Sequence, residues 1–243
     1  MEKSKYKFRS NTVVLMGDTH STEITSKIVR IIENGSDVIH LGDNGLGFGS
    51  ESYALKNAEM WITMLNDLCL NKDIILYILR GNHDNPEVWN LSSLSNVILV
   101  KDGEIAIFPN GKKALLTGGG ISLDRCVRIK GESYWEDEIT SDFEVKKADV
   151  IFSHDTSDAF NRITATLGDH WGWYMARDKM LWADCYKQRN CMGDIIEKSG
   201  AKLIYYGHHH NDWREFVGGV RGQCVNIEEV LEVDAENFIV NIT

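Results

Sequence analysis

Five short polar clusters in this chain combine side chains that commonly bind transition metals in proteins. They are Gly17-Asp18-Thr19-His20, Gly42-Asp43-Asn44, Gly81-Asn82-His83-Asp84, Ser153-His154-Asp155 and Gly207-His208-His209-His210. Carboxylate, imidazole and amide groups together suit Mn, Fe, Zn or Ni better than Ca or Mg, which prefer all-oxygen shells. The clusters therefore predict a site for divalent transition metals.

The number of candidate ligands indicates two metal ions rather than one. Seven side chains qualify: Asp18, His20, Asp43, Asn82, His154, His208 and His210. A single zinc ion needs only about four ligands, so seven favour two ions that share one ligand. Alternate residues of an extended segment point the same way, which lets Asp18 and His20 reach one cavity, and His208 and His210 likewise.

Each cluster follows an apolar run that predicts a buried strand, at residues 12–16, 37–41, 74–79, 149–152 and 202–206. Helical spacing at residues 22–34 and 50–70 separates the first three runs. This strand–helix–strand order predicts crossover connections and a largely parallel sheet. Ligands of such sheets bind beyond the carboxyl ends of the strands, where we expect the clusters to converge.

The remainder of the chain predicts a second sheet. Further strands are expected at residues 97–100, 104–108 and 113–117, and antiparallel strands over 214–242. A helix is expected from about 175 to 199, with Trp182, Tyr186, Ile195 and Ile196 facing the core. The chain has no internal repeat or low-complexity linker, so we expect one domain over residues 1–243, with two packed sheets and helices outside.

Composition narrows the function and the compartment. A formal net charge of -10 argues against a protein that coats nucleic acid non-specifically, although a local basic groove stays possible. The five scattered cysteines contain no Cys-x-x-Cys pair, which favours free thiols in a reducing compartment. The apolar runs are too short for a membrane span or a signal peptide, so the expected location is the cytoplasm.

The five clusters, in this order, resemble the calcineurin-like metallophosphoesterase family, whose pattern is Asp-x-His, Gly-Asp, Gly-Asn-His-Asp/Glu, His and Gly-His-x-His. The match spans residues 17–210. The resemblance implies a four-layer α/β/β/α sandwich of two mixed sheets flanked by helices. It also implies a division of the ligands: Asp18, His20 and His210 for one ion, Asn82, His154 and His208 for the other, and Asp43 bridging both.

The resemblance assigns His83 a place beside the substrate without binding metal, with Asp84 orienting its ring. Two departures make the chain less similar to the protein Ser/Thr phosphatases. Asp84 stands where they have Glu, and Asn44-Gly45-Leu46-Gly47 follows Asp43 where their motif continues to Asp-Arg-Gly. The segment from residue 118 to 138 looks like that of a group of bacterial and phage metallophosphoesterases. Within it, Arg125 and Arg128 could bind a substrate phosphate, anchor the loop or form a structural salt bridge. His170, beside Trp171 and Trp173, could line the substrate.

The reaction implied by the resemblance is hydrolysis of a phosphodiester or phosphomonoester by in-line attack of a metal-bridging hydroxide, with His83 assisting at the leaving group. The expected cofactors are two divalent ions, Mn first and Fe, Zn or Ni as alternatives. The expected substrate is a small phosphate ester or a nucleotide. Nucleic acid is a possible partner, and no membrane partner is expected. A Mn-dependent DNA or RNA nuclease and a non-catalytic scaffold are the alternatives. The complete ligand set disfavours the scaffold, and 243 residues leave little room for the capping domain that nucleases of this family usually add.

Overall fold

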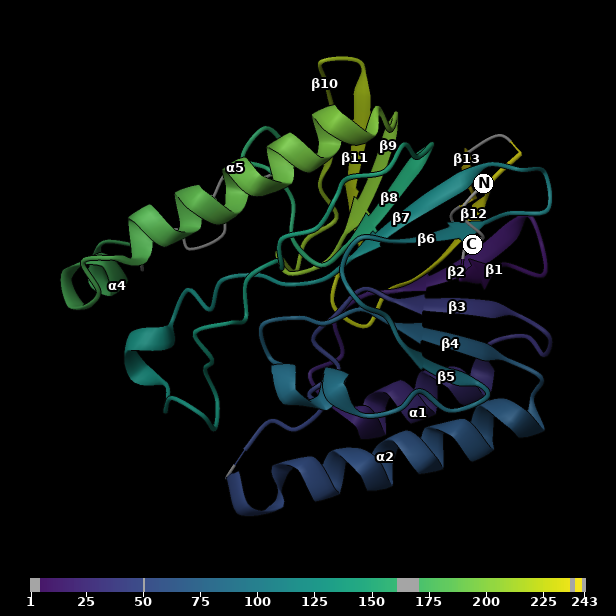
Figure 1. Cartoon of the computed structure of the whole chain (residues 1–243), viewed down its shortest axis with the longest axis horizontal. Coiled ribbons are helices and arrows are strands. Elements are labelled where there is room, and N and C mark those ends of the chain that lie inside the picture. Colours follow the sequence, from purple (N-terminus) through teal and green to yellow (C-terminus); the bar gives the residue numbers. More distant parts are fainter. Residues whose placement is uncertain (1–4, 50, 161–170, 237–238, 242–243) are drawn as a thin grey trace.

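Two β-sheets packed face to face form the centre of the molecule (Figure 1). The computed structural model describes residues 5–49, 51–160, 171–236 and 239–241. The six-stranded sheet has the order β13 (Ile239–Asn241), β12 (Val230–Asp234), β2 (Thr12–Met16), β3 (Asp37–His40), β4 (Ile75–Ile78) and β5 (Val97–Leu99). The seven-stranded sheet has the order β1 (Tyr6–Lys7), β6 (Glu104–Ile107), β7 (Lys113–Thr117), β8 (Val150–Ser153), β9 (Leu203–Tyr206), β11 (Val220–Cys224) and β10 (Arg214–Val217).

Both sheets are mixed, with a run of parallel strands at the heart of each. In the smaller sheet β2, β3, β4 and β5 are parallel, and β12 pairs antiparallel with both β2 and β13. In the larger sheet β7, β8, β9 and β11 are parallel, while β6 and β10 are antiparallel to their neighbours β7 and β11. The parallel runs place several strand carboxyl ends at one edge, as the sequence predicts.

Helices cover the outer face of each sheet. The helices are α1 (Thr22–Ile31), α2 (Glu51–Asn71), α4 (Trp171–Arg177) and α5 (Leu181–Ser199), with short 3₁₀ helices η1 (Pro86–Asn90) and η2 (Arg125–Val127). Figure 1 shows α1 and α2 beneath the smaller sheet and α5 along the larger one. Between β7 and β8, residues 118–149 form a long segment, called the β7–β8 segment below, that extends beyond the sheets and contains η2.

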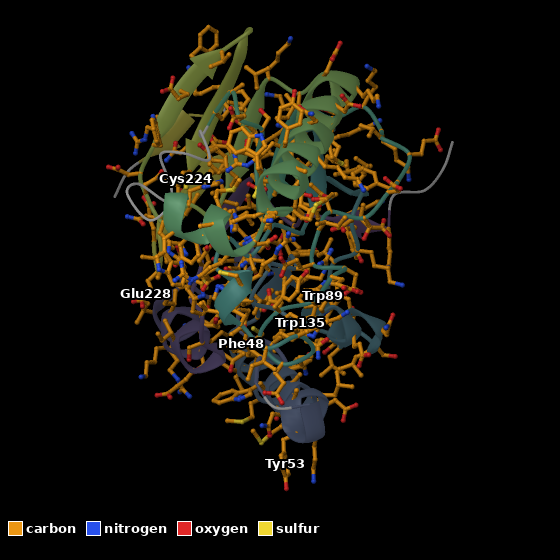
Figure 2. The ribbon with its side chains drawn as sticks, turned by 90° about the vertical axis from the view of Figure 1, so that its left-hand side faces the viewer. Phe48, Tyr53, Trp89, Trp135, Cys224 and Glu228 are labelled. Carbon is orange, nitrogen blue, oxygen red and sulfur yellow. The ribbon has the colours of Figure 1, made fainter. Side chains whose placement is uncertain are left out.

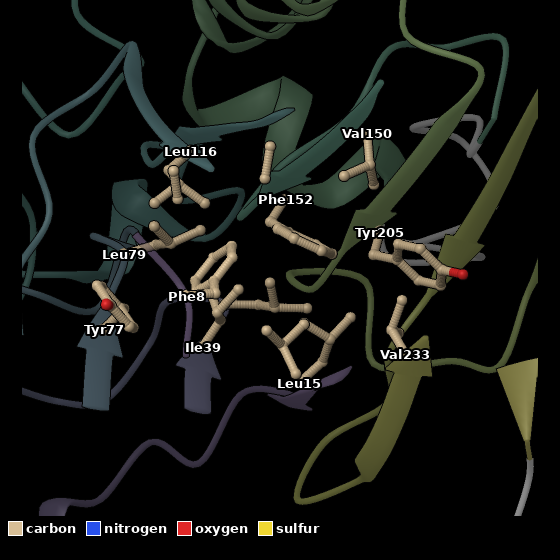
Figure 3. Packing of buried hydrophobic residues seen from close by; sticks show 14 of the residues in the cluster. Phe8, Leu15, Ile39, Tyr77, Leu79, Leu116, Val150, Phe152, Tyr205 and Val233 are labelled. Atoms are coloured by element: carbon tan, nitrogen blue, oxygen red, sulfur yellow. The ribbon is translucent and has the colours of Figure 1, made fainter. Parts of the chain in front are cut away.

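Alternation of side chains along the strands divides the apolar core into layers. Between the sheets, Leu15 and Ile39 pack in one cluster with Phe152 and Tyr205 of the opposite sheet (Figure 3). On the outer faces, a second cluster joins the smaller sheet to α1 and α2, and a third joins the larger sheet to α5. Successive strand residues point to opposite faces, so each central strand contributes to two layers. The expected four-layer α/β/β/α sandwich is confirmed.

The expected helix over 175–199 is divided. Its predicted inner face is confirmed for Ile195 and Ile196 and is wrong for Trp182 and Tyr186. The Asp178 side chain accepts the backbone N–H groups of Met180 and Leu181 between α4 and α5. Trp182 and Tyr186 are 46 % and 61 % exposed, and Leu181, Cys185 and Met192 face inward with Ile195 and Ile196. The buried stripe begins one residue earlier than predicted, which rotates each aromatic ring about 100° away from the core. No helix in the described ranges is both long and apolar enough to span a membrane.

The carboxyl-terminal strands differ from a simple antiparallel array. β10 and β11 form an antiparallel hairpin, but β11 joins the larger sheet by parallel pairing with β9. β12 then pairs with β2 in the other sheet. The chain therefore crosses between sheets after β11, a step that alternation of polar and apolar residues does not encode. All five cysteines are free thiols, as expected.

Candidate metal centre

All seven candidate ligands lie at strand ends that meet at one edge of the sandwich. Asp18 and His20 follow β2, Asp43 follows β3, Asn82 follows β4, His154 follows β8, and His208 and His210 follow β9. A direct contact joins the two sheets here, because the backbone N–H of His208 donates to Asp18 Oδ2 at 2.9 Å. The Gly207 N–H donates to the His154 carbonyl at 2.9 Å, which aligns the ends of β8 and β9. The structure therefore brings together every ligand that the sequence predicts.

The ligands form two groups that share Asp43. Asp18, His20, Asp43 and His210 can each offer one atom within 4.8 Å of the others, and so can Asp43, His154 and His208. Asn82 belongs with the second group, because its Oδ1 is 3.1 Å from His154 Nε2. The Asp43 oxygens face different groups: Oδ2 is 3.8 Å from His20 Nδ1, and Oδ1 is 3.4 Å from His154 Nε2. A carboxylate that bridges two cations needs this orientation.

The lone pairs in both groups converge. His154 Nδ1 donates to the Leu41 carbonyl at 2.8 Å, which leaves Nε2 as the nitrogen that faces Asn82 and Asp43. In the other group, His210 Nε2 is 2.9 Å from His20 Nε2 and 3.0 Å from Asp18 Oδ2. Lone pairs this close repel one another unless a proton or a cation lies between them. The donor types and their convergence both fit transition-metal ions.

Burial and mutual charge set the protonation of these groups. Burial, together with the Asp18 and Asp84 charges, raises the pKa of Asp43 to about 7. Burial opposes protonation of His154, but the Asp43 and Asp18 carboxylates raise its pKa. A hydrogen bond with Asp18 raises the pKa of His210. These shifts favour protonation of Asp43, His154 and His210, whereas burial lowers the pKa of His20 and His208; a dication would displace any proton held by a ligand on binding.

Backbone strain concentrates at the ligands. His20, Asp43, His208 and His210 have φ angles of 50°, 55°, 66° and 49°. This left-handed region costs a non-glycine residue about 1–3 kcal/mol, and such residues persist only where their surroundings hold them. The hydrogen bonds around the centre therefore have to fix its backbone as well as its side chains.

Asp84 differs from its expected role and fixes the backbone instead. Its buried carboxylate accepts four backbone N–H groups, from Gly81 at 2.8 Å, Asn44 at 3.4 Å, Gly45 at 2.8 Å and Leu46 at 3.0 Å. These bonds tie together the loops that carry Asp43 and Asn82. They replace the expected bond to the imidazole of His83, so the prediction that Asp84 orients this ring is corrected.

His83 borders the centre beside Arg128. Its backbone N–H donates to Asp43 Oδ1 at 2.7 Å, and its ring Nε2 is 3.9 Å from Asp43 Oδ2. Arg128 NH2 lies 2.7 Å from the same Nε2 and can only donate, so Nε2 accepts. Burial, followed by the Arg128 charge, lowers the pKa of His83 to about 2, which keeps the ring neutral.

The two candidate arginines have different environments. Arg125 forms ion pairs with Asp178 and Asp184, which anchor the β7–β8 segment at the beginning of α5. Arg128 reaches the centre, and its other contacts are Asp124, Ser122 and the Ser133 carbonyl. The two arginines therefore differ. Arg125 forms structural salt bridges that anchor the segment, and Arg128 lies next to His83, where it could contact a substrate.

Ser122 and Glu138 hold the side chain of Asn82, a role that sequence reasoning missed. Asn82 Nδ2 donates to Ser122 Oγ at 3.1 Å, and this hydroxyl donates to Glu138 Oε2 at 2.7 Å. The Ser122 N–H donates to Glu138 Oε1 at 2.6 Å, and both residues are buried. Because Nδ2 is engaged, Asn82 Oδ1 must face His154. Ser122 and Glu138 are separated along an irregular segment, so no periodic signal links them.

The remaining histidines are distributed outside the two ligand groups. His209 Nε2 contacts Asp155 Oδ1 at 3.1 Å and Arg189 NH2 at 3.2 Å, which ties the His208–His210 turn to α5. Asp155, His208 and His209 form a third group of close donor atoms. His40 is buried in β3 and bonds the Thr19 hydroxyl at 3.1 Å, as expected of a core histidine. His170 lies outside the described residues.

We expect Asp84→Asn to lower the free energy of unfolding of chelator-treated protein by roughly 2–4 kcal/mol, because an amide NH₂ would face N–H donors. Metal content should fall with it. Urea denaturation and metal analysis measure these effects, with exposed Asp194→Asn on α5 as the control. If Asp84→Asn kept wild-type stability and metal content and lost only the activity that depends on His83, the result would support the role of Asp84 in orienting the His83 ring.

We expect Ser122→Ala to weaken one of the two metal sites by about 10–100-fold, because the Asn82 amide could then rotate and present Nδ2. The site of Asp18, His20 and His210 should keep its affinity. Metal titration with separate affinities for the two ions tests this, with Ser26→Ala on α1 as the control. Two sites of wild-type affinity in Ser122→Ala would contradict the role of the hydroxyl.

Comparisons with known proteins agree with this geometry. No curated protein matches the chain. A crystal structure with 9 % sequence identity superposes with a TM-score of 0.54 over 96 % of this chain and 98 % of that chain, which is a likeness of fold alone. The sequence profile described as calcineurin-like phosphoesterase matches residues 12–212. The chain, with metal-ligand clusters at the ends of its central strands, belongs to the calcineurin-like phosphoesterase family.

Proposed function

We propose that this protein hydrolyses phosphate esters with two divalent transition-metal ions bound by the seven ligands. The observation that carries the proposal is Asp43, with one oxygen directed at each ligand group. Two bound ions about 3.5–4 Å apart would polarise phosphate oxygens and lower the pKa of water. The proposed ion is Mn, with Fe, Zn or Ni as alternatives: carboxylate and amide oxygens suit Mn, and imidazole nitrogens suit Fe, Zn and Ni.

Arg128 is the proposed phosphate-binding residue. Its guanidinium is held by Asp124 Oδ1, 2.6 Å from its Nε, and by the Ser122 hydroxyl, 3.0 Å from NH1. A planar guanidinium can donate two parallel hydrogen bonds to a phosphate, and it remains charged at any physiological pH. Because NH2 points at His83 at the border of the centre, a substrate oxygen there could replace His83 Nε2 as its acceptor.

His83 is the proposed residue at the leaving group. Its ring packs against His20, with ring centroids 4.4 Å apart, yet it belongs to neither ligand group. Once a phosphate oxygen takes the Arg128 hydrogen bond, His83 Nε2 is free to take up a proton from water, which it would then donate to the oxygen that leaves. General acid assistance of this kind contributes about 10²–10⁴-fold to a rate.

We expect Asp43→Asn and His83→Ala each to reduce hydrolysis of p-nitrophenyl phosphate and bis(p-nitrophenyl) phosphate at least 100-fold in the presence of Mn²⁺. Asp43→Asn should also lose bound metal, whereas His83→Ala should retain both ions. Asp194→Asn on α5 is the matched control. Full activity of both variants would overturn the site. A wild-type protein that binds no metal would favour the scaffold alternative, and cleavage of plasmid DNA in preference to both esters would favour the nuclease.

We expect Arg128→Ala to lower kcat/KM for these esters by about 10–10³-fold with unchanged metal content, because a phosphate would lose charge-assisted hydrogen bonds. Arg128→Lys should recover only part of this loss, since a lysine is a point charge without the planar pair of donors. Steady-state kinetics with metal analysis make the measurement. Wild-type kcat/KM in Arg128→Ala would exclude Arg128 from substrate binding.

A further inference from the structure

The loop between β3 and α2 presents an aromatic ring at the border of the metal centre. Phe48 lies with its ring centroid 5.2 Å from that of His83 and with the two planes only 17° apart. Its side chain is 42 % exposed, whereas Phe8, Phe108 and Phe152 are buried in the core. A single exposed phenylalanine is common on protein surfaces, so the informative feature of Phe48 is its stacking on His83 and not its exposure alone.

The position of Phe48 is fixed from both sides of the loop. Leu46 before it is fully buried, and the Leu46 carbonyl accepts the Asn85 N–H at 2.8 Å. Gly49 after it donates its N–H to the Glu132 carbonyl of the β7–β8 segment at 2.8 Å. Between them Gly47 has φ +71°, and a Cβ there would lie 2.8 Å from the Asn85 side chain. These contacts fix the backbone from which the Phe48 side chain extends.

A second ring supports this orientation. Trp135, which is buried, meets Phe48 edge to face with ring centroids 6.1 Å apart. Figure 2 views the molecule from the side on which the β7–β8 segment lies, and the two labelled rings are neighbours there. With His83 stacked against it and Trp135 at its edge, Phe48 keeps a partly exposed aromatic ring beside His83, and His83 in turn contacts Arg128.

We propose that the phosphate ester cleaved at this centre carries a planar aromatic group, a nucleobase or an aryl ring, which stacks on Phe48. The inference rests on the proposed phosphoesterase activity and adds the class of substrate. With the phosphate at Arg128 and the metal ligands, and with the leaving group at His83, the organic part of the ester would extend along His83. Two rings border His83: His20, which belongs to a ligand group, and Phe48, which does not. Stacking of a base on an aromatic side chain contributes about 1–3 kcal/mol, or roughly 5–150-fold in affinity.

Pairs of substrates with the same scissile bond test the proposal. Adenosine 5′-monophosphate is compared with ribose 5-phosphate, and benzyl phosphate with cyclohexylmethyl phosphate, each also as its methyl diester. We expect wild-type kcat/KM to be roughly 5–150-fold higher for the planar member of at least one pair, mainly through KM. A preference in the first pair alone identifies a nucleobase, and a preference in both pairs identifies aromatic rings in general.

Variants at residue 48 separate stacking from simple burial. Phe48→Leu keeps apolar area without a π-face, so it should lower kcat/KM for the planar member of a pair roughly 5-fold or more beyond any loss for the non-planar member. Phe48→Tyr should keep the preference for the planar substrate, because tyrosine retains an aromatic face. Phe216→Leu is the matched control, because Phe216 is 71 % exposed on β10 at the edge of the larger sheet.

The outcomes distinguish this inference from the proposed function. Hydrolysis of both members of each pair with equal kcat/KM in the wild type would overturn only the aromatic subsite. An equal loss for both members in Phe48→Leu would do the same, because it would assign Phe48 a structural role. Hydrolysis of no ester in any pair, and of neither nitrophenyl ester, would overturn the phosphoesterase activity and the subsite with it.

Discussion

The buried carboxylate of Asp43 is the group on which the rest of the centre depends. It lies between two sets of lone-pair donors, where its own pKa is raised to about 7 because burial and neighbouring charges oppose ionisation. A buried charge needs a counter-charge close by, and two cations that share this carboxylate supply one on each side. Parallel strands of both sheets bring the donors to this point, and the apolar layer between the sheets holds the strand ends in register.

The surrounding hydrogen bonds resist the strain that this convergence creates. Asp84 holds the turns after β3 and β4, and Ser122 holds the Asn82 amide in one orientation. Asp155 and Arg189 contact His209 between the strained His208 and His210. Each is a buried polar contact to the loops that carry the candidate ligands, and such supporting contacts hold ligand side chains in the geometry that a site needs.

Much of this architecture could be predicted from sequence, and the failures have physical reasons. The strand at residues 12–16 and the positions of the seven candidate ligands could be predicted because an apolar run followed by a polar cluster is a local signal. The contacts of Asp84 could not be predicted, because three of their donors are backbone N–H groups about forty positions away in the sequence. The predicted burial of Trp182 and Tyr186 is wrong because Leu181, Cys185 and Met192, and not the aromatic residues, determine which face of α5 packs inward. β1 has only two residues, too few to show a period.

The central claim is that two cations share Asp43, and the electron paramagnetic resonance spectrum of the Mn²⁺-loaded protein tests it most directly. Two ions about 3.5–4 Å apart and joined by a carboxylate interact magnetically. We predict two Mn²⁺ per chain with an exchange-coupled spectrum, and loss of the coupling in Asp43→Asn. A single bound Mn²⁺, or two ions that give only the spectrum of isolated Mn²⁺, would contradict the account.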